Sequence, residues 1–250
     1  ARKARFIQQK CDWALRQRWA SKGKIAFRSD FPKKAIDTHI WVIGGGRTNF
    51  AAQTFAAMDK VWPNVGKNMT WSEWTVCGAG RATNRNNPEF FPAFEGIGEL
   101  SARKSKAGYL TSLYVNGRLW DKATCGFAYA QMDATKKEDG SLHNEDYASW
   151  GTNYHFAVMC PYCPKWQQVM KSLAVRCLDD LCMDGVYFDQ VACAAMKPCY
   201  DSSHGHPLGG GRWWEQGYRQ MFTEIRRAFA ERGATIVSEQ MGEMWLGLID

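Results

Sequence analysis

The chain has 250 residues, of which 45% are hydrophobic and 23% charged, and its formal net charge is +7. These values are ordinary for a globular domain that can bury its core without disulfides or metals. No apolar run approaches the ~20 residues of a membrane-spanning helix. The basic residues form no recognisable nucleic-acid-binding module, so neither a membrane span nor a nucleic-acid partner is expected.

Residues 1–30 predict a helix and a short extended piece that lead into the main fold, residues 31–250. Basic side chains cluster in the first 34 residues, as in a solvated helix and loop. No apolar segment of a signal peptide follows Ala1–Arg5. Because the chain has no initiator Met, we expect it to begin inside a larger protein. Localisation therefore stays open, and a secreted or periplasmic one is compatible with the sequence.

The chain then alternates between strand-like and helix-like segments. In chain order these are a strand at 36–43, a helix at 49–61, a strand at 69–76, a helix at 94–107, a strand at 109–115, a long insertion at 120–155, a helix at 165–182, a strand at 185–188, a helix at 213–232 and a strand at 234–237. The polar part of the insertion, 133–146, predicts a surface loop.

Regular alternation of this kind predicts an α/β fold with a parallel sheet covered by helices. Both an open doubly wound sheet and a closed barrel fit. The nucleotide-binding patterns G-x-G-x-x-G and Walker A are absent, and we expect no cofactor. We favour the (β/α)8 TIM barrel, with about five of its eight βα units in this chain and the remainder beyond it.

The chain has nine cysteines, so at least one has no partner within it. Cys160-Pro-Tyr-Cys163 has the spacing of a redox motif. A zinc site would need a second pair, and Cys177 and Cys182 are not spaced like one. The main expectation is structural or free thiols with no metal. A disulfide among Cys160, Cys163, Cys193 and Cys199, or a metal site, is the alternative.

Candidate site residues come from the carboxyl ends of the strands, where TIM barrels place their active sites. Tryptophan stacks on the apolar faces of sugar rings, while carboxylates, amides and arginine bind sugar hydroxyls. The residues expected to contact a substrate on this basis are His39, Trp41, Trp74, Asn116, Arg118, Trp120, Asp121 and Gln190. The mixture predicts an oligosaccharide, a polysaccharide or a glycoconjugate as the partner.

Asp189 and Glu239 each follow an apolar strand, where a buried charge is costly without a purpose. The alternative is a turn or helix-capping role for Asp189 and an ion pair with an arginine such as Arg118 for Glu239. Neighbouring strands lie about 4.8 Å apart, so both carboxyl groups can face one pocket. Retaining glycosidases hold their carboxyl groups about 5–5.5 Å apart and inverting ones about 6.5–9.5 Å. Adjacent strands therefore favour a retaining mechanism.

The segments Asp184–Asp189 and Ser238–Glu239 resemble the α-amylase clan and related α-glycosidase barrels, although Tyr187 stands where that clan has an arginine. As a whole the chain is similar to a poorly characterised group of bacterial glycoside-hydrolase-like TIM-barrel proteins. That similarity is carried by 114–121, 184–190 and 199–214. The resemblance implies that Asp189 is the nucleophile and Glu239 the acid/base.

In this hypothesis Glu239 has a pKa raised by burial or by the charge of Asp189, and it protonates the leaving oxygen. Asn116 and Arg118 would hold Asp189 ionised or bind hydroxyls. His204 and His206 either bind substrate or order their loop, and a metal site with Asp201 is a further alternative. Glu243 is a second carboxylate near Glu239 that could exchange roles with it.

Two other functions fit the same residues. A non-catalytic carbohydrate-binding barrel would keep the aromatic side chains but lack the carboxylate geometry. A metal-dependent hydrolase would need several converging ligands, and the strand ends offer few histidines. The sugar, the linkage and the oligomeric state cannot be read from the sequence.

Overall fold

The computed structural model describes residues 2–16, 31–44, 47–75, 85–149, 152–240 and 242–250. The helices are α1 (Arg2–Leu15), α2 (Lys33–Ile36), α3 (Thr48–Val61), α4 (Ile97–Lys106), α5 (Phe127–Ala130), α6 (Pro164–Asp179) and α7 (Trp213–Phe229). Short 3-10 turns are η2 (Gln131–Asp133), η3 (Ser202–His204), η4 (Ala230–Arg232) and η5 (Glu243–Trp245). The strands are β1 (Ile40–Gly44), β2 (Lys67–Trp71), β3 (Leu110–Asn116), β4 (Leu119–Asp121), β5 (Asn144–Ser149), β6 (Thr152–Val158), β7 (Gly185–Asp189) and β8 (Thr235–Ser238).

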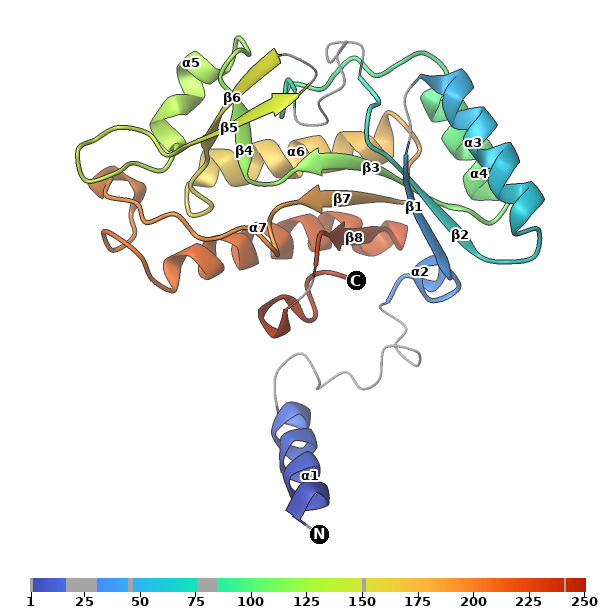
Figure 1. Ribbon diagram of the computed structural model, residues 1–250, viewed down its shortest axis with the longest axis horizontal. Coiled ribbons are helices and arrows are strands. Elements are labelled where there is room, and N and C mark those ends of the chain that lie inside the picture. The colour runs from blue at the N-terminus through green and yellow to red at the C-terminus, as the bar shows by residue number, and fades with distance from the viewer. Residues whose placement is uncertain (1, 17–30, 45–46, 76–84, 150–151, 241) are drawn as a thin grey trace.

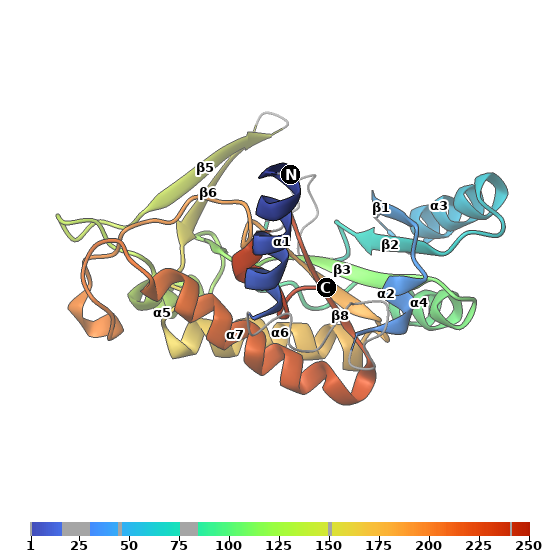
Figure 2. The ribbon, with the colours of Figure 1, turned by 90° about the horizontal axis from the view of Figure 1, so that it is seen from below.

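Five strands form one parallel sheet in the order β1-β2-β3-β7-β8. Because each crossover leads to the next strand in the same direction and such crossovers are right-handed, the connecting helices fall on one face of the sheet. Figures 1 and 2 show α3, α4, α6 and α7 along that face of a curved sheet. The predicted parallel α/β sheet is confirmed. Among the described residues the sheet is open, so the closed barrel stays a prediction.

Apolar side chains of the central strands, such as Val186 and Phe188 of β7, are buried against this helical layer. α7 places Tyr218, Phe222 and Ile225 at helical spacing, and all three are fully buried. Phe222 meets Phe188 of β7 edge to face, with the ring centroids 5.2 Å apart. The polar or aromatic residues that alternate with these along the strands therefore point to the opposite, helix-free face.

The first strand starts later than the sequence suggested. Lys33–Ile36 forms the short helix α2, and β1 runs only from Ile40 to Gly44. Residues that were expected near the carboxyl end of this strand thus lie further toward its amino end. The helix predicted at the N-terminus is present as α1, whereas the extended piece predicted before residue 30 lies outside the described residues.

The insertion between β3 and α6 is folded into a second sheet. β4, β6 and β5 form an antiparallel sheet in that order, and Lys136 bridges to Leu142. The expectation of a plain surface loop at 133–146 was therefore wrong in part, because residues of this segment pair with each other and, in β5, with β6. Within the described residues no helix is long and apolar enough to cross a membrane.

Candidate active site

Asp189 and Glu239 meet at the carboxyl edge of the parallel sheet. Asp189 is the last residue of β7, and Glu239 directly follows β8, whose Ser238 is in register with Phe188. Asn116 at the end of β3 is in register with Asp189. The two carboxyl groups are close enough for each to shift the pKa of the other, and we call them the carboxylate pair. The register of β7 and β8 thus places the two residues at the same edge of the sheet, as the sequence predicted.

Asp189 is held by neutral donors. Tyr114, on the same face of β3, donates its hydroxyl to Asp189 Oδ2. Asn116 Nδ2 donates to the same oxygen at 3.2 Å, and the backbone N–H of Gln190 also donates to the carboxyl group. Among the described residues no lysine or arginine pairs with Asp189. The carboxyl is therefore fixed in place without being neutralised by a cation.

Asp184, at the other end of the same strand, shows what a purely structural aspartate looks like here. Lys34 pairs with it at 2.7 Å, and Ser105 and Thr111 donate to its oxygens. Such a group has a full set of charge-matched partners. Asp189 has no such cation among the described residues and interacts with a second carboxyl instead, which distinguishes it from a structural link of the Asp184 kind.

The two members of the carboxylate pair differ in environment. Burial raises the pKa of Asp189 to about 6, a rise to which Glu239 adds and which the Tyr114 hydrogen bond opposes. Glu239 is exposed, and its pKa is lowered, first by the thiol of Cys193, which donates to Oε2 at 3.0 Å, and then by Asp189. Of the two groups, Asp189 is thus the one that binds a proton more tightly. This reverses the sequence-based expectation that the pKa of Glu239 would be the raised one.

Both carboxylates are followed by a glutamine in the left-handed region. The φ angles are 66° for Gln190 and 58° for Gln240, a conformation that is uncommon for residues other than glycine. At Gln190 the side chain accepts from Arg118 at 3.3 Å and donates to Tyr147 at 2.9 Å. The chain therefore turns sharply after each carboxylate, which leaves the side chain at the rim of the sheet.

Asn116 and Arg118 both lie near the pair, but they have different partners. Asn116 is fully buried, and its Oδ1 accepts from the backbone N–H groups of Arg118 and Leu119, each at 2.9 Å. Arg118 is 1% exposed and pairs with Glu145 of β5 at 2.6 Å. Arg118 therefore joins the second sheet to the loop after β7. Its ion-pair partner is Glu145 and not Glu239, the partner that the sequence offered as an alternative.

Two predicted contact residues lie away from this edge. His39 precedes β1, and its backbone N–H bonds to the carbonyl of Gly66 at the amino end of the sheet. Trp41 is 45% exposed on the helix-free face, but it is in register with Asn68, near the start of β2. The late start of β1 places both residues toward the amino edge, far along the strands from Asp189.

Three further residues that were expected to contact a substrate are buried and hydrogen-bonded to the protein itself. Trp74 is 1% exposed and donates Nε1 to the carbonyl of Tyr114 at 2.8 Å. Trp120 donates to Thr124 at 2.8 Å, and Asp121 accepts from the backbone N–H groups of residues 86 and 123. These side chains pack below the protein surface near the strand ends, so they are not accessible to a sugar in this conformation. Glu243 lies in η5, and the structure does not describe its side chain.

His204 and His206 are not at the carboxylate pair. They lie buried with Cys160 and Cys199, and one ligand atom from each of the four residues falls within 4.8 Å of the others. We call these four residues the thiol–imidazole cluster. No metal was expected from the sequence, but the fold brings together four side chains that could bind one. Among the cysteines whose side chains are described, all are free thiols.

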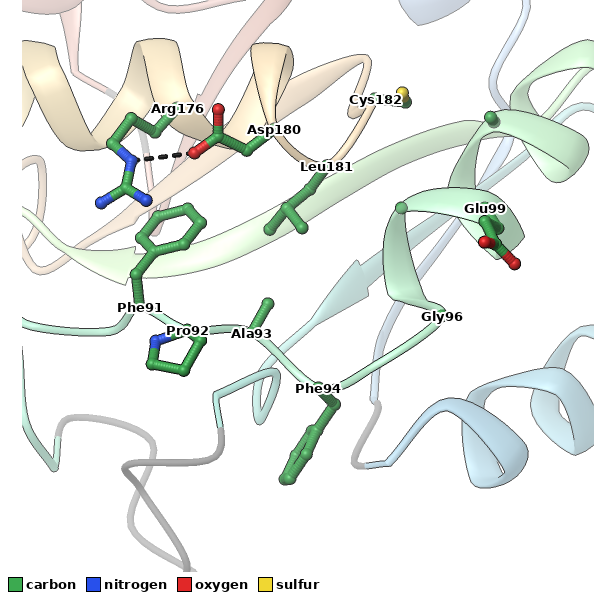
Figure 3. A pocket seen from close by; sticks show the side chains of 12 residues that line it. Phe91, Pro92, Ala93, Phe94, Gly96, Glu99, Arg176, Asp180, Leu181 and Cys182 are labelled. Carbon is green, nitrogen blue, oxygen red and sulfur yellow. Dashed lines mark hydrogen bonds and ion pairs between the residues drawn. The ribbon is translucent and has the colours of Figure 1, made fainter.

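The structure also contains a groove between α4 and α6, which is shown in Figure 3. It is lined by apolar residues such as Phe91 and Leu181, and Arg176 spans it, stacked on Phe91 at 3.7 Å and paired with Asp180 at 2.9 Å. Neither Asp189 nor Glu239 lines it. The groove therefore belongs to the helical layer and is separate from the carboxylate pair.

Sequence reasoning missed Tyr114 and Cys193. Tyr114 could have been found, because it lies two residues before Asn116 and so shares its face of β3. Cys193 has no comparable signal. It reaches Glu239 only because the loop after Asp189 folds back toward β8.

Comparisons with known proteins bear on the fold and on the family of the chain. The fold resembles that of solved glycosidases: an α-N-acetylgalactosaminidase of Bifidobacterium bifidum in complex with GalNAc (TM-score 0.65, 14% identity, 90% of this chain and 40% of that chain) and an α-galactosidase of Thermus thermophilus (TM-score 0.57, 14% identity, 85% and 40%). At this identity the likeness establishes the fold alone. Neither of these proteins is an α-amylase, so the finer resemblance to that clan stays a prediction.

The chain belongs to the family described as domain of unknown function DUF6259, whose model matches residues 4–250. Two relatives are named. "Putative glycoside hydrolase" of Bacteroides thetaiotaomicron is 34% identical over 80% of this chain, and "Putative glycoside hydrolase 22789" of Monosiga brevicollis is 26% identical over 92%. The chain spans 29% and 21% of the length of these relatives.

Proposed function

We propose that the protein is a retaining glycoside hydrolase, with Asp189 as nucleophile and Glu239 as general acid/base. One observation carries this proposal: two carboxyl groups at the carboxyl edge of adjacent parallel strands, with pKa values shifted in opposite directions. The names of the relatives and the fold of the structural neighbours support the same class.

The architecture proposed with this function is the TIM barrel. Five sequential parallel strands with helices on one face only leave the other face to be covered. Pairing of the free edges of β1 and β8 with further βα units would close the sheet around that face. The carboxylate pair would then lie at the mouth of the barrel.

The spacing of the pair favours retention. Inverting enzymes keep their carboxyl groups about 6.5–9.5 Å apart so that a water fits between them. Adjacent strands lie about 4.8 Å apart, and the two carboxyl groups are close enough to shift each other's pKa. A sugar that enters between them would set the separation of about 5–5.5 Å that a covalent intermediate requires.

Proton transfer accompanies this separation. At neutral pH most Asp189 is ionised, since its pKa is about 6. A bound sugar removes water from Glu239, which raises the pKa of Glu239 and lets it hold a proton. Asp189 then attacks the anomeric carbon as the glycosidic bond breaks, and Glu239 gives its proton to the leaving oxygen. In the second half, Glu239 takes a proton from water as the water displaces Asp189.

The first experiment is hydrolysis of aryl glycosides by the intact protein, with α-galactosides and α-N-acetylgalactosaminides leading the panel because two structural neighbours carry those names. The anomer that is released first, followed by NMR, is expected to have the configuration of the substrate. An inverted product would refute retention. Binding of sugars without any turnover would instead indicate a carbohydrate-binding protein.

A leaving-group series separates the two carboxylates. Glu239→Gln is expected to lose activity on substrates with poor leaving groups, to keep it on dinitrophenyl glycosides, and to be rescued by azide. Asp189→Asn is expected to lose both activities. If Glu239→Gln shows no dependence on the leaving group, Glu239 is not the acid/base.

A further inference from the structure

The thiol–imidazole cluster is buried and has no part in the proposed reaction. Cys160 follows β6, and Cys199, His204 and His206 come from the loop between β7 and α7. Cys160 and Cys199 are fully buried, and the two histidines are each 7% exposed. Cys199 Sγ lies 3.4 Å from His204 Nδ1. Two segments that lie far apart in the sequence thus bring their soft donors to one point.

The orientation of each histidine resembles that of a metal ligand. His204 turns Nε2 to the carbonyl oxygen of Met132 at 2.8 Å, which leaves Nδ1 for the sulfur side. His206 turns Nδ1 to the carbonyl oxygen of Pro207 at 2.7 Å, while its buried Nε2 has no hydrogen-bond partner among the described residues. Ligating histidines characteristically donate their second ring N–H to a carbonyl or a carboxylate.

We propose that Cys160, Cys199, His204 and His206 bind a structural Zn²⁺ ion. In a tetrahedral zinc site with Zn–S about 2.3 Å and Zn–N about 2.0–2.1 Å, the ligand atoms are about 3.3–3.8 Å apart. The four donor atoms already lie within 4.8 Å of one another, so small side-chain movements complete the site. Two thiolates and two neutral imidazoles balance the charge of Zn²⁺, which removes the cost of a buried net charge.

Donor chemistry selects the metal. Thiolate and imidazole together in a closed four-donor set favour zinc, whereas calcium and magnesium require oxygen ligands. The cluster is closed by protein on all sides, which is typical of a structural site rather than a catalytic one. Cys163, at the start of α6, is hydrogen-bonded to Cys160 and lies outside the four donors. It is therefore a supporting thiol in this proposal.

The ion would join the β6–α6 turn to the loop after β7. This turn also lies directly against α7, where a Cβ on Gly217 would come within 2.5 Å of the Pro161 backbone. His206 stacks on Trp213 of α7 with ring centroids 3.7 Å apart. The metal would thus fix the far end of the loop that starts at Asp189 and carries Cys193 to Glu239.

The test is metal analysis of the intact protein, purified reduced and without chelator. We expect about one zinc per chain, and tetrahedral thiolate–imidazole bands after replacement by Co²⁺. Cys199→Ser and His206→Gln are expected to retain less than about a tenth of the zinc. Cys177→Ser is the matched control, since Cys177 is an equally buried thiol outside the cluster, and it should keep the metal.

Release of zinc from the wild type by a mercurial thiol reagent gives a readout that does not depend on the folding of a variant. We expect one zinc to leave as the buried thiols react. Absence of zinc both in the purified protein and after reconstitution of the reduced protein would overturn the proposal. So would a Cys160–Cys163 disulfide in the purified protein, or a Cys177→Ser variant that loses metal as fully as Cys199→Ser.

Discussion

The loop that follows β7 begins at the carboxylate pair and ends at the thiol–imidazole cluster. At its start, Asp189 and Glu239 lie at a solvent-accessible edge, carry like charges when both are ionised, and are held by neutral donors. At its end, four buried donors converge with complementary second partners. One loop thus joins an exposed end that carries the proposed chemistry to a buried end that can hold it in place.

The two ends therefore have opposite expected effects on stability. The pKa of Asp189 is raised in the folded state, so the native protein binds this proton more tightly than the unfolded chain does. The associated stability is fully present below the unfolded pKa of about 4 and is lost as the pH rises through about 6. At neutral pH the reactive end costs stability, whereas a bound metal would add it.

The largest expected effect is on turnover. Asp189→Asn should lower kcat by about 10³-fold or more, because the nucleophile is removed. The far-ultraviolet circular dichroism should be unchanged, since Tyr114 and Asn116 can still bond to the amide. Wild-type turnover in this variant would contradict the role assigned to Asp189.

The same variant should be more stable than the wild type at neutral pH. We expect Asp189→Asn to gain about 1–3 kcal/mol in unfolding free energy at pH 7.5, and the gain should disappear below about pH 4. Denaturant melts at both pH values measure this difference. A loss of stability at pH 7.5 would mean that Asp189 is a structural group like Asp184.

Removal of the proposed metal should lower the stability of the protein, in contrast to Asp189→Asn. Chelation under denaturing conditions followed by refolding, or Cys199→Ser, is expected to lower Tm by about 10 °C or more. Activity should fall as the loop between the two ends loosens. Scanning calorimetry with and without added zinc tests this, and Cys177→Ser distinguishes metal loss from the cost of a buried hydroxyl. Equal melting with and without zinc would separate the cluster from stability altogether.

A smaller effect is expected at Tyr114. Tyr114→Phe removes a donor that lowers the pKa of Asp189, so the acid limb of kcat/KM, which lies near pH 6 in the wild type, should move up by about one pH unit. Because the two carboxyls titrate together, the limb reports the pair as a whole. An unmoved acid limb would show that the hydroxyl does not act on the reacting group.

The smallest expected effect is at Cys193. Cys193→Ala removes the thiol that lowers the pKa of Glu239, and kcat should change by about threefold, since a thiol is a weak hydrogen-bond donor. Cys193→Ser keeps a donor and is the conservative control. A loss as large as that of Asp189→Asn would make Cys193 part of the chemistry.

The alternation of strands and helices, the parallel sheet and the carboxyl groups at two strand ends could all be predicted from the sequence. These follow from local patterns: apolar runs of strand length, amphipathic helices, and a polar residue where each strand stops. Asp189 and Glu239 could be found in this way because adjacent parallel strands end at the same edge. The start of β1, and with it the positions of His39 and Trp41, could not, because Lys33–Ile36 is short and its helical state depends on contacts such as Lys34 with Asp184.

Which polar groups come into contact could not be predicted from the sequence, because these contacts depend on the tertiary structure. Cys160 and His204 are separated by the whole of α6 and β7, and their approach depends on how α7 packs against the β6–α6 turn. The burial of Trp74, Trp120 and Asp121 and the pairing of Arg118 with Glu145 also arise from long-range packing. The pKa order of Asp189 and Glu239 was decided in the same way, because burial and the reach of Cys193 are properties of the folded chain and not of neighbouring residues in the sequence.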